Sequence, residues 1–254
     1  MKYYKRLAEK QCFTREEVVA LTGNYNTAGS VLKNYQKKGY VRQVRRNLYV
    51  MINLADRQPV ASKFLIAGRI TPTAYVSHHS AFEYYGCANQ VSSQVEVSSE
   101  TPFVSFSFAG NTFTYIASRI QDGVITNWWD IRITDIERAV VDGINDFEKV
   151  MGLEELLRCL LRVVSVREGK LLGCLAAYGK QALYQKAGYI LRHFKGKWNL
   201  SDDFFSECAA RIGKSTRYLT KNHEGNYDAK WQLVAPADLM GITSKMDCEN
   251  AELR

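Results

Sequence analysis

Residues 3–39 carry a closely spaced set of helix and turn signals. After a short helix expected at Tyr3–Glu9, Thr14-Arg15-Glu16-Glu17 fits a capping box, in which a threonine and a glutamate satisfy backbone amides at the start of a helix. That helix should end at Gly23, because glycine readily adopts the left-handed conformation that follows a helix. Asn24, Asn26 or Thr27 can cap the next helix, which is predicted from an apolar stripe at helical spacing: Ala28, Val31, Leu32 and Tyr35.

The polar residues of this third helix fall on the face opposite the stripe. They are Asn26, Thr27, Ser30, Lys33, Asn34 and Lys37. Gly39 should end the helix, and residues 40–50 then alternate like two short strands with a turn at Arg45-Arg46-Asn47, where Asn47 tolerates a positive φ. Two helices joined by a glycine turn and followed by a basic hairpin predict a winged helix-turn-helix.

The charge of the chain is concentrated in the same segment. Residues 1–56 hold 11 Lys and Arg against 4 Asp and Glu, whereas residues 57–254 hold 23 against 22. Clustered cations neutralise DNA phosphates and release counterions, and a polar helix face can address base edges in the major groove. We therefore expect binding to double-stranded DNA through the six polar helix residues together with three hairpin arginines, Arg42, Arg45 and Arg46. The alternative is a solvated basic surface on a three-helix protein-binding module.

Composition excludes several other classes. The basic start, Met1-Lys2-Tyr3-Tyr4-Lys5-Arg6, is followed by no apolar run, and the longest uncharged stretch, residues 101–118, alternates like strands. We therefore expect a cytoplasmic protein without membrane association. Six scattered cysteines without a C-x-x-C spacing indicate reduced thiols, and the four histidines form no zinc pattern. No cofactor and no metal are expected.

The rest of the chain predicts a second, larger domain. A polar connector at residues 53–59, ending in Pro59, favours a division into a winged helix-turn-helix domain at residues 1–56 and an α+β domain at residues 57–254. Strands at 94–99, 103–108, 112–117 and 131–133 predict an antiparallel sheet, with a hairpin around residues 109–111. Thr134-Asp135-Ile136-Glu137 fits a second capping box. Helices and a final strand pair at 217–220 and 231–234 follow, and the tail from Met240 is expected to fray.

Two groups of residues could suggest catalysis. His78-His79 lies next to Ser80 and Glu83, but adjacent helical residues point about 100° apart, which favours a structural or capping role. A metal-dependent nuclease could use an acidic-x-Lys tripeptide, as in Asp228-Ala229-Lys230 or Glu168-Gly169-Lys170. Such tripeptides are common by chance. No nucleophile elbow, P-loop or dinucleotide fingerprint is present, and we expect no catalytic residues and no enzyme.

The order of these segments resembles the AbiEi family of antitoxins, also described as transcriptional regulators of viral defence systems. The resemblance covers residues 14–194 and depends most on "TDIERAVVDGI" (134–144) and "YVSHHSAFEYYG" (75–86). The wing contributes "KKGYVRQVRRNLYV", where Asn47 replaces the glycine that usually follows the basic pair in the family. Asn should preserve the turn.

The resemblance implies an antitoxin of a type IV toxin–antitoxin or abortive-infection system. Such a protein counteracts a nucleotidyltransferase-like toxin, often without a stable complex, and represses its own operon by binding promoter DNA. Two chains would share an inverted repeat. The alternative is a stand-alone winged-helix regulator whose C-terminal domain senses a ligand or dimerises; a neighbouring nucleotidyltransferase gene would separate the two.

Overall fold

The computed structural model describes residues 2–222 and 224–243 and shows a mixed α+β chain. Two compact units are present. The first contains the chain up to Val76 together with Ser92–Arg119 and Ile125–Ile133, and the second contains Ser77–Val91, Ile120–Val124 and the chain from Thr134 onward. The boundary expected near residue 56 lies within the first unit and stays a prediction. Of the tail expected to fray, residues 244–254 lie outside the described part.

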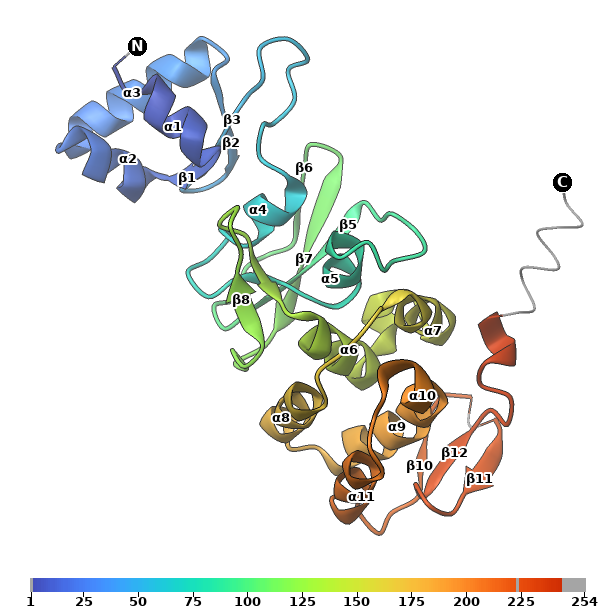
Figure 1. The fold of residues 1–254 in the computed structure, drawn as a ribbon. Coiled ribbons are helices and arrows are strands. Elements are labelled where there is room, and N and C mark those ends of the chain that lie inside the picture. The colour runs from blue at the N-terminus through green and yellow to red at the C-terminus, as the bar shows by residue number, and fades with distance from the viewer. Residues whose placement is uncertain (1, 223, 244–254) are drawn as a thin grey trace, which may run out of the picture. The chain divides into compact units, whose positions relative to one another are not determined.

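The N-terminal elements of the first unit surround one apolar core (Figure 1). Leu7, Phe13, Leu32 and Met51 are buried in it. β1 pairs with β3, and β3 with β2, both antiparallel. The elements are α1 (Tyr4–Lys10), β1 (Cys12–Thr14), α2 (Arg15–Thr22), α3 (Tyr25–Lys37), β2 (Val41–Arg45) and β3 (Leu48–Met51).

A six-stranded sheet, in the order β6-β7-β5-β4-β9-β8, lies mostly in the first unit. The helix α4 (Lys63–Ala67) precedes the sheet in the chain. The strands of the sheet are β4 (Tyr75–Val76), β5 (Gln94–Ser99), β6 (Phe106–Phe108), β7 (Asn111–Ala117), β8 (Val124–Thr126) and β9 (Arg132–Thr134). The β6–β7 hairpin is antiparallel, as predicted. The expectation of a wholly antiparallel sheet is wrong, because β5 pairs with β7 and β4 with β9 in parallel. β7 lies between β6 and β5. The hairpin reverses the chain between β6 and β7, and β7 then runs parallel to β5.

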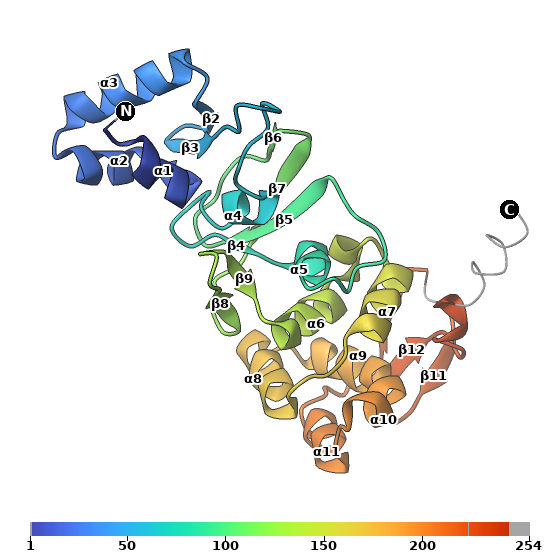
Figure 2. The same cartoon turned by 45° about the horizontal axis from the view of Figure 1, so that its top comes forward.

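Helices dominate the second unit, and α6 lies among them (Figures 1 and 2). Residues Glu137–Ile144 of α6 are all buried. Its neighbours are α5 (His78–Tyr84), η1 (Phe147–Val150), α7 (Leu153–Arg162), α8 (Glu168–Tyr178) and α9 (Gln181–Leu191), and the chain continues through η2 (Arg192–Phe194), α10 (Lys195–Trp198) and α11 (Asp202–Ala210). None of the helices in the described residues combines the length and apolar character needed to cross a bilayer.

The start of α6 (Ile136–Asn145) differs from the second predicted capping box. Asp135, not Thr134, caps the helix by accepting a hydrogen bond from the backbone N–H of Arg138 at 2.9 Å. The carboxylate of Glu137 accepts instead from the backbone and side chain of Arg167, at 2.9 and 3.1 Å. The capping residue is therefore one position later, and the glutamate serves a long-range contact.

The C-terminal strands also differ from the predicted pair. The structure has three short strands, β10 (Arg217–Tyr218), β11 (Asn226–Asp228) and β12 (Leu233–Ala235). β12 lies between the other two, parallel to β10 and antiparallel to β11. Trp231, expected at the start of a strand, precedes β12 and is buried under α11 through an edge contact with Phe205. Apolar burial thus takes precedence over strand pairing at this residue.

Candidate nucleic-acid interface

The start of α2 has the predicted capping box. The Thr14 hydroxyl accepts from the Glu17 backbone N–H at 3.4 Å, and the Glu17 carboxylate accepts from the Thr14 backbone N–H at 2.8 Å. Gly23 ends the helix with φ 74°. Asn24 then caps α3 by accepting from the backbone N–H groups of Asn26 and Thr27, at 2.9 and 3.1 Å. The two helices are thus fixed by interactions local to the turn.

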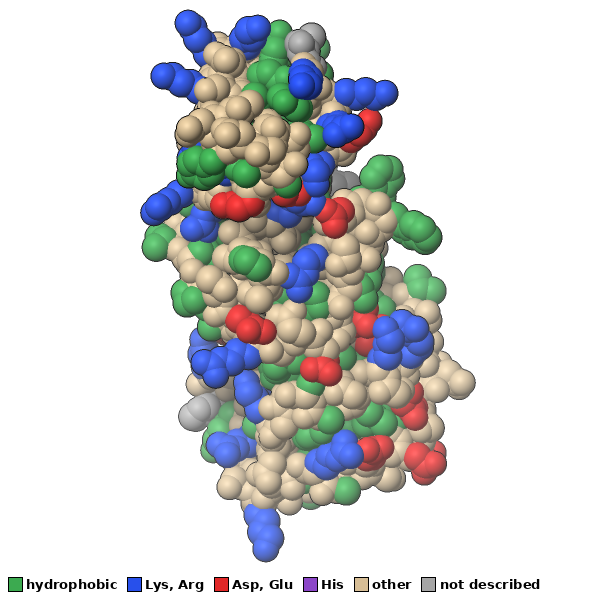
Figure 3. All heavy atoms as spheres, turned by 90° about the vertical axis from the view of Figure 1, so that its left-hand side faces the viewer, with side chains coloured by type: hydrophobic (Ala, Val, Ile, Leu, Met, Phe, Trp, Pro, Cys, Tyr) green, Lys and Arg blue, Asp and Glu red, His purple; other side chains and the backbone are tan. Residues whose placement is uncertain are grey.

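The outer face of α3 is exposed. Its buried residues, Ala28, Leu32 and Tyr35, belong to the core, as the stripe predicted. The residues predicted to face a nucleic acid are all exposed: Asn26, Thr27, Ser30, Lys33, Asn34 and Lys37. Figure 3 shows Lys and Arg side chains projecting from the surface around the N-terminal helices. The structure therefore presents a polar, cationic helix face to solvent.

Asn47 holds the hairpin turn against α2. Its φ is 67°, the positive value expected for this turn. Its side-chain oxygen accepts from the Arg15 backbone N–H at 3.2 Å, and its amide nitrogen donates to the Glu16 carboxylate at 2.7 Å. The hydrogen bond from Asn47 lowers the pKa of the Glu16 carboxyl below its ordinary value. Asn47 thus does more than permit the turn, because it also ties the turn to the first residues of α2.

The three hairpin arginines have different surroundings. Arg46 is exposed at the turn, while Arg42 is exposed along β2 and donates to the Arg57 carbonyl at 3.1 Å. The guanidinium of Arg45 is half-buried over two rings, 5.5 Å from the centre of Phe103 and 5.4 Å from that of Phe106. Arg45 is therefore the least accessible of the three to a phosphate.

A surface cavity of about 490 Å³ lies beside the hairpin turn, between Arg46 and the segment Gly68–Pro72. Arg69 crosses this region and contacts two carboxylates, Glu17 of α2 at 3.1 Å and Asp130 of the β8–β9 turn. The β8–β9 turn is therefore joined to α2 through Arg69, which lines the same cavity as the exposed Arg46.

Two adjacent tryptophans in the β8–β9 turn were not anticipated from the sequence. Trp128 is fully exposed and Trp129 is 73% exposed. Two hydrogen bonds stabilise the turn, because the Asn127 side chain accepts from the backbone N–H groups of Trp129 and Ile131 at 2.9 and 3.0 Å. Exposed aromatic side chains on a fixed turn are typical of contact surfaces. The sequence feature that could have indicated this surface is the pair of adjacent tryptophans between two short strands.

A buried cluster in the second unit has donors that could hold a metal ion. His79, Glu155 and Cys159 place one ligand atom each within 4.8 Å of one another. Glu155 Oε1 lies 3.4 Å from His79 Nε2, accepts from the Cys159 thiol at 3.6 Å, and accepts from the Asn89 backbone N–H at 2.8 Å. These contacts join α5, α7 and the loop after α5. His78 is also buried and lies 2.9 Å from the Ser77 hydroxyl, so both histidines have structural contacts.

The two acidic-x-Lys tripeptides also make structural contacts. Asp228 forms an ion pair with Arg192 and accepts from the Trp231 backbone N–H at 3.1 Å. Glu168 accepts from the backbone and hydroxyl of Ser201, at 2.7 and 2.8 Å, and so joins α8 to the start of α11. Each carboxylate therefore has a local role in packing helices or strands together.

No protein-family model matches this chain, and no curated protein matches it either. Among solved structures, the fold is similar to the crystal structure of the RV2827C protein from Mycobacterium tuberculosis. The TM-score is 0.58, and the match covers 93% of this chain and 89% of that chain. The sequence identity is 14%, so the similarity concerns the fold alone.

Proposed function

We propose that this chain is a DNA-binding transcriptional repressor that also acts as the antitoxin of a toxin–antitoxin pair. In this proposal α2, α3 and the β2–β3 hairpin form a winged helix-turn-helix, with α3 in the major groove and the hairpin beside the backbone. The observation that carries the proposal is the exposed polar and cationic face of α3 next to an exposed Arg46, in a segment with 11 cations and 4 carboxylates.

The residues divide by the chemistry that they offer. Asn26, Ser30 and Lys33 on the outer face of α3 suit base edges, since amide, hydroxyl and ammonium groups donate to major-groove acceptors. Lys37, Arg42 and Arg46 suit phosphates. We assign Arg45 to holding the hairpin on Phe103 and Phe106. Phosphate contacts would set affinity, and the helix would set sequence preference.

DNA binding is tested by fluorescence anisotropy with a labelled duplex from the region upstream of the gene. Tight, salt-sensitive binding that prefers this duplex over a scrambled one supports the proposal. Binding that is equal on both duplexes, or insensitive to salt, contradicts a sequence-specific repressor. A palindromic duplex compared with its half-site shows whether two chains share an inverted repeat.

The antitoxin role follows from the AbiEi resemblance and requires no catalysis by this chain. The test is co-expression with the adjacent gene and a promoter reporter, using the full chain. Deleting residues 1–56 would uncover Phe103 and Phe106, so substitutions are the better tool. Lys33→Ala with Arg46→Ala should release the promoter and still rescue growth. A folded variant that loses rescue would contradict the separation of the two activities.

A second candidate is a regulator whose C-terminal part senses a ligand. The observation that favours it is a cation-lined cavity of about 450 Å³ in the second unit. The two candidate functions make different predictions about whether the product of the adjacent gene is toxic. A toxic nucleotidyltransferase that this chain neutralises supports the first, and the absence of any toxicity to neutralise supports the second.

A further inference from the structure

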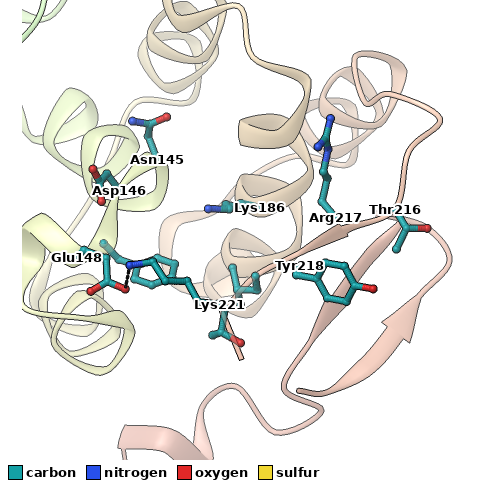
Figure 4. Close-up of a pocket in the computed structure, with 11 residues that line it drawn as sticks. Asn145, Asp146, Glu148, Lys186, Thr216, Arg217, Tyr218 and Lys221 are labelled. Atoms are coloured by element: carbon teal, nitrogen blue, oxygen red, sulfur yellow. Dashed lines mark ion pairs between the residues drawn. The ribbon is translucent and has the colours of Figure 1, made fainter. Parts of the chain in front are cut away.

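The cavity in the second unit is formed by three segments that are distant in sequence. The end of α6 and η1 provide Asn145–Glu148, α9 provides Lys186, and β10 with its flanks provides Thr216–Lys221. Figure 4 shows Lys186 extending from α9 toward Asp146, with Lys221 beside Glu148 and Arg217 rising from β10. The volume is about 450 Å³, within the range of small-molecule sites.

Cations outnumber carboxylates around this cavity. The carboxylates are Asp146, which is paired with Lys149, and Glu148, which lies 3.4 Å from Lys221. Lys180 donates to the Asn145 side chain at 3.1 Å. Among the residues that line the cavity, three cations (Lys186, Arg217 and Lys221) face two carboxylates (Asp146 and Glu148). Crowding of like charges is unfavourable unless an anion compensates it.

Lys186 and Arg217 are the cations left for a ligand. Within the described residues, neither side chain forms an ion pair or a hydrogen bond. The Lys186 ammonium is half-buried, 5.3 Å from the ring centre of Phe147. Burial lowers the pKa of Lys186, with Asp146 opposing and Lys180 adding to the effect. An ammonium and a guanidinium in one cavity are donors well suited to a phosphate group.

We propose that this cavity binds a small organic phosphate of nucleotide size, with the phosphate held by Lys186 and Arg217. The volume exceeds the needs of a single phosphate, and the aromatic residues Phe147 and Tyr218 line the remaining space. This inference goes beyond the proposed function, because DNA recognition uses residues of the first unit.

The test is isothermal titration of the full chain at low salt with ATP, GTP, AMP and inorganic phosphate. Lys186→Met removes the charge and keeps much of the side chain, and Arg217→Gln removes the second cation. Lys214→Gln is the matched control, since Lys214 is an exposed cation of the same segment outside the cavity. Each cavity variant should weaken nucleotide binding at least about tenfold, and the control should not.

A thermal melt separates a ligand site from a structural role. Without nucleotide, Lys186→Met should melt no lower than the wild type, because the substitution removes a half-buried cation that forms no ion pair with the described residues. With nucleotide, only the wild type and the control should rise in Tm. Absence of binding by every nucleotide, binding unchanged in both cavity variants, or inorganic phosphate binding as tightly as the nucleotides would overturn the proposal. Lys186→Met should bind duplex DNA as the wild type does in the anisotropy assay. A failure of the nucleotide-binding proposal can therefore be told apart from a failure of the DNA-binding proposal.

Discussion

The side-chain amide of Asn47 donates to the carboxylate of Glu16 at 2.7 Å, across 31 residues of sequence. With the bond from the Arg15 backbone N–H to Asn47 Oδ1, it joins the hairpin turn to the start of α2. The direction of α2 and the position of Arg46 are thereby coupled. A glycine at this position could make the same turn, but it could not make these two hydrogen bonds.

Substitutions at Asn47 should separate backbone conformation from hydrogen bonding. Asn47→Gly keeps the positive φ and loses both bonds, which should lower the free energy of unfolding by about 1 kcal/mol. Asn47→Ala should lower the free energy of unfolding by about 1 kcal/mol more than Asn47→Gly, since alanine, unlike glycine, is strained at a positive φ. Urea denaturation measures both. Equal stability of the glycine variant and the wild type would show that the bonds contribute nothing.

The same pair predicts a dependence on pH. The pKa of Glu16 is lowered in the folded chain, so the stabilisation is present above the ordinary glutamate pKa and is lost as pH falls through the lowered value. Asn47→Gly should therefore differ most from the wild type near neutral pH and least in acid. A difference that stays constant down to acid pH would contradict this coupling.

Loss of a phosphate contact should reduce the salt dependence of DNA binding. With the three phosphate contacts proposed per chain, from Lys37, Arg42 and Arg46, the slope of log K against log salt should be about −3. Arg46→Ala should make the slope smaller by about 1 and weaken binding to specific and random duplexes alike. Arg119→Ala, which removes an exposed arginine after β7, is the control. An unchanged slope in Arg46→Ala would remove it from the interface.

Residues on the outer face of α3 should instead alter sequence preference. Asn26→Ala or Lys33→Ala should reduce the ratio of specific to random binding, because a good base contact contributes about 1–3 kcal/mol of discrimination. Competition anisotropy with the upstream and scrambled duplexes measures the ratio. If these variants lose equal affinity for both duplexes, α3 contacts only phosphates.

The exposed tryptophans offer an internal reporter. Trp128 and Trp129 are exposed, whereas Trp198 and Trp231 are buried, so iodide should quench the first pair selectively. Since Arg69 links the β8–β9 turn to α2, bound duplex DNA should shield this pair. Trp128→Phe with Trp129→Phe should abolish the iodide-sensitive fraction. Identical quenching with and without saturating DNA would place the turn outside the interface.

The buried ion pair of α6 should be important for stability. The Arg138 guanidinium and the Asp142 carboxylate are both almost fully buried, and the Tyr178 hydroxyl donates to the same carboxylate. Arg138→Met should cost about 3–5 kcal/mol by leaving a buried charge, and adding Asp142→Leu should recover part of the loss. Urea denaturation of the single and double variants measures the coupling. Additive losses would show that the pair acts as two independent contacts.

Local patterns in the sequence predicted the N-terminal elements well. The Thr14–Glu17 capping box, the end of α2 at Gly23, the apolar face of α3 and the turn at Asn47 all depend on residues within one or two helical turns or one hairpin. Such interactions are specified by neighbouring residues, so one sequence is enough to predict them. The β6–β7 hairpin was predictable for the same reason.

Long-range contacts were decided by the tertiary structure. No local pattern places Arg45 over Phe103 and Phe106, directs Glu137 to Arg167 instead of its own helix, or pairs β5 with β7 in parallel. The cavity around Lys186 likewise combines three distant segments. The sequence alone determined which faces of the helices and strands are polar and which are apolar, because the spacing of apolar residues follows the local geometry of each element. Which distant groups meet depends on how the buried faces pack, and only the folded chain determines that.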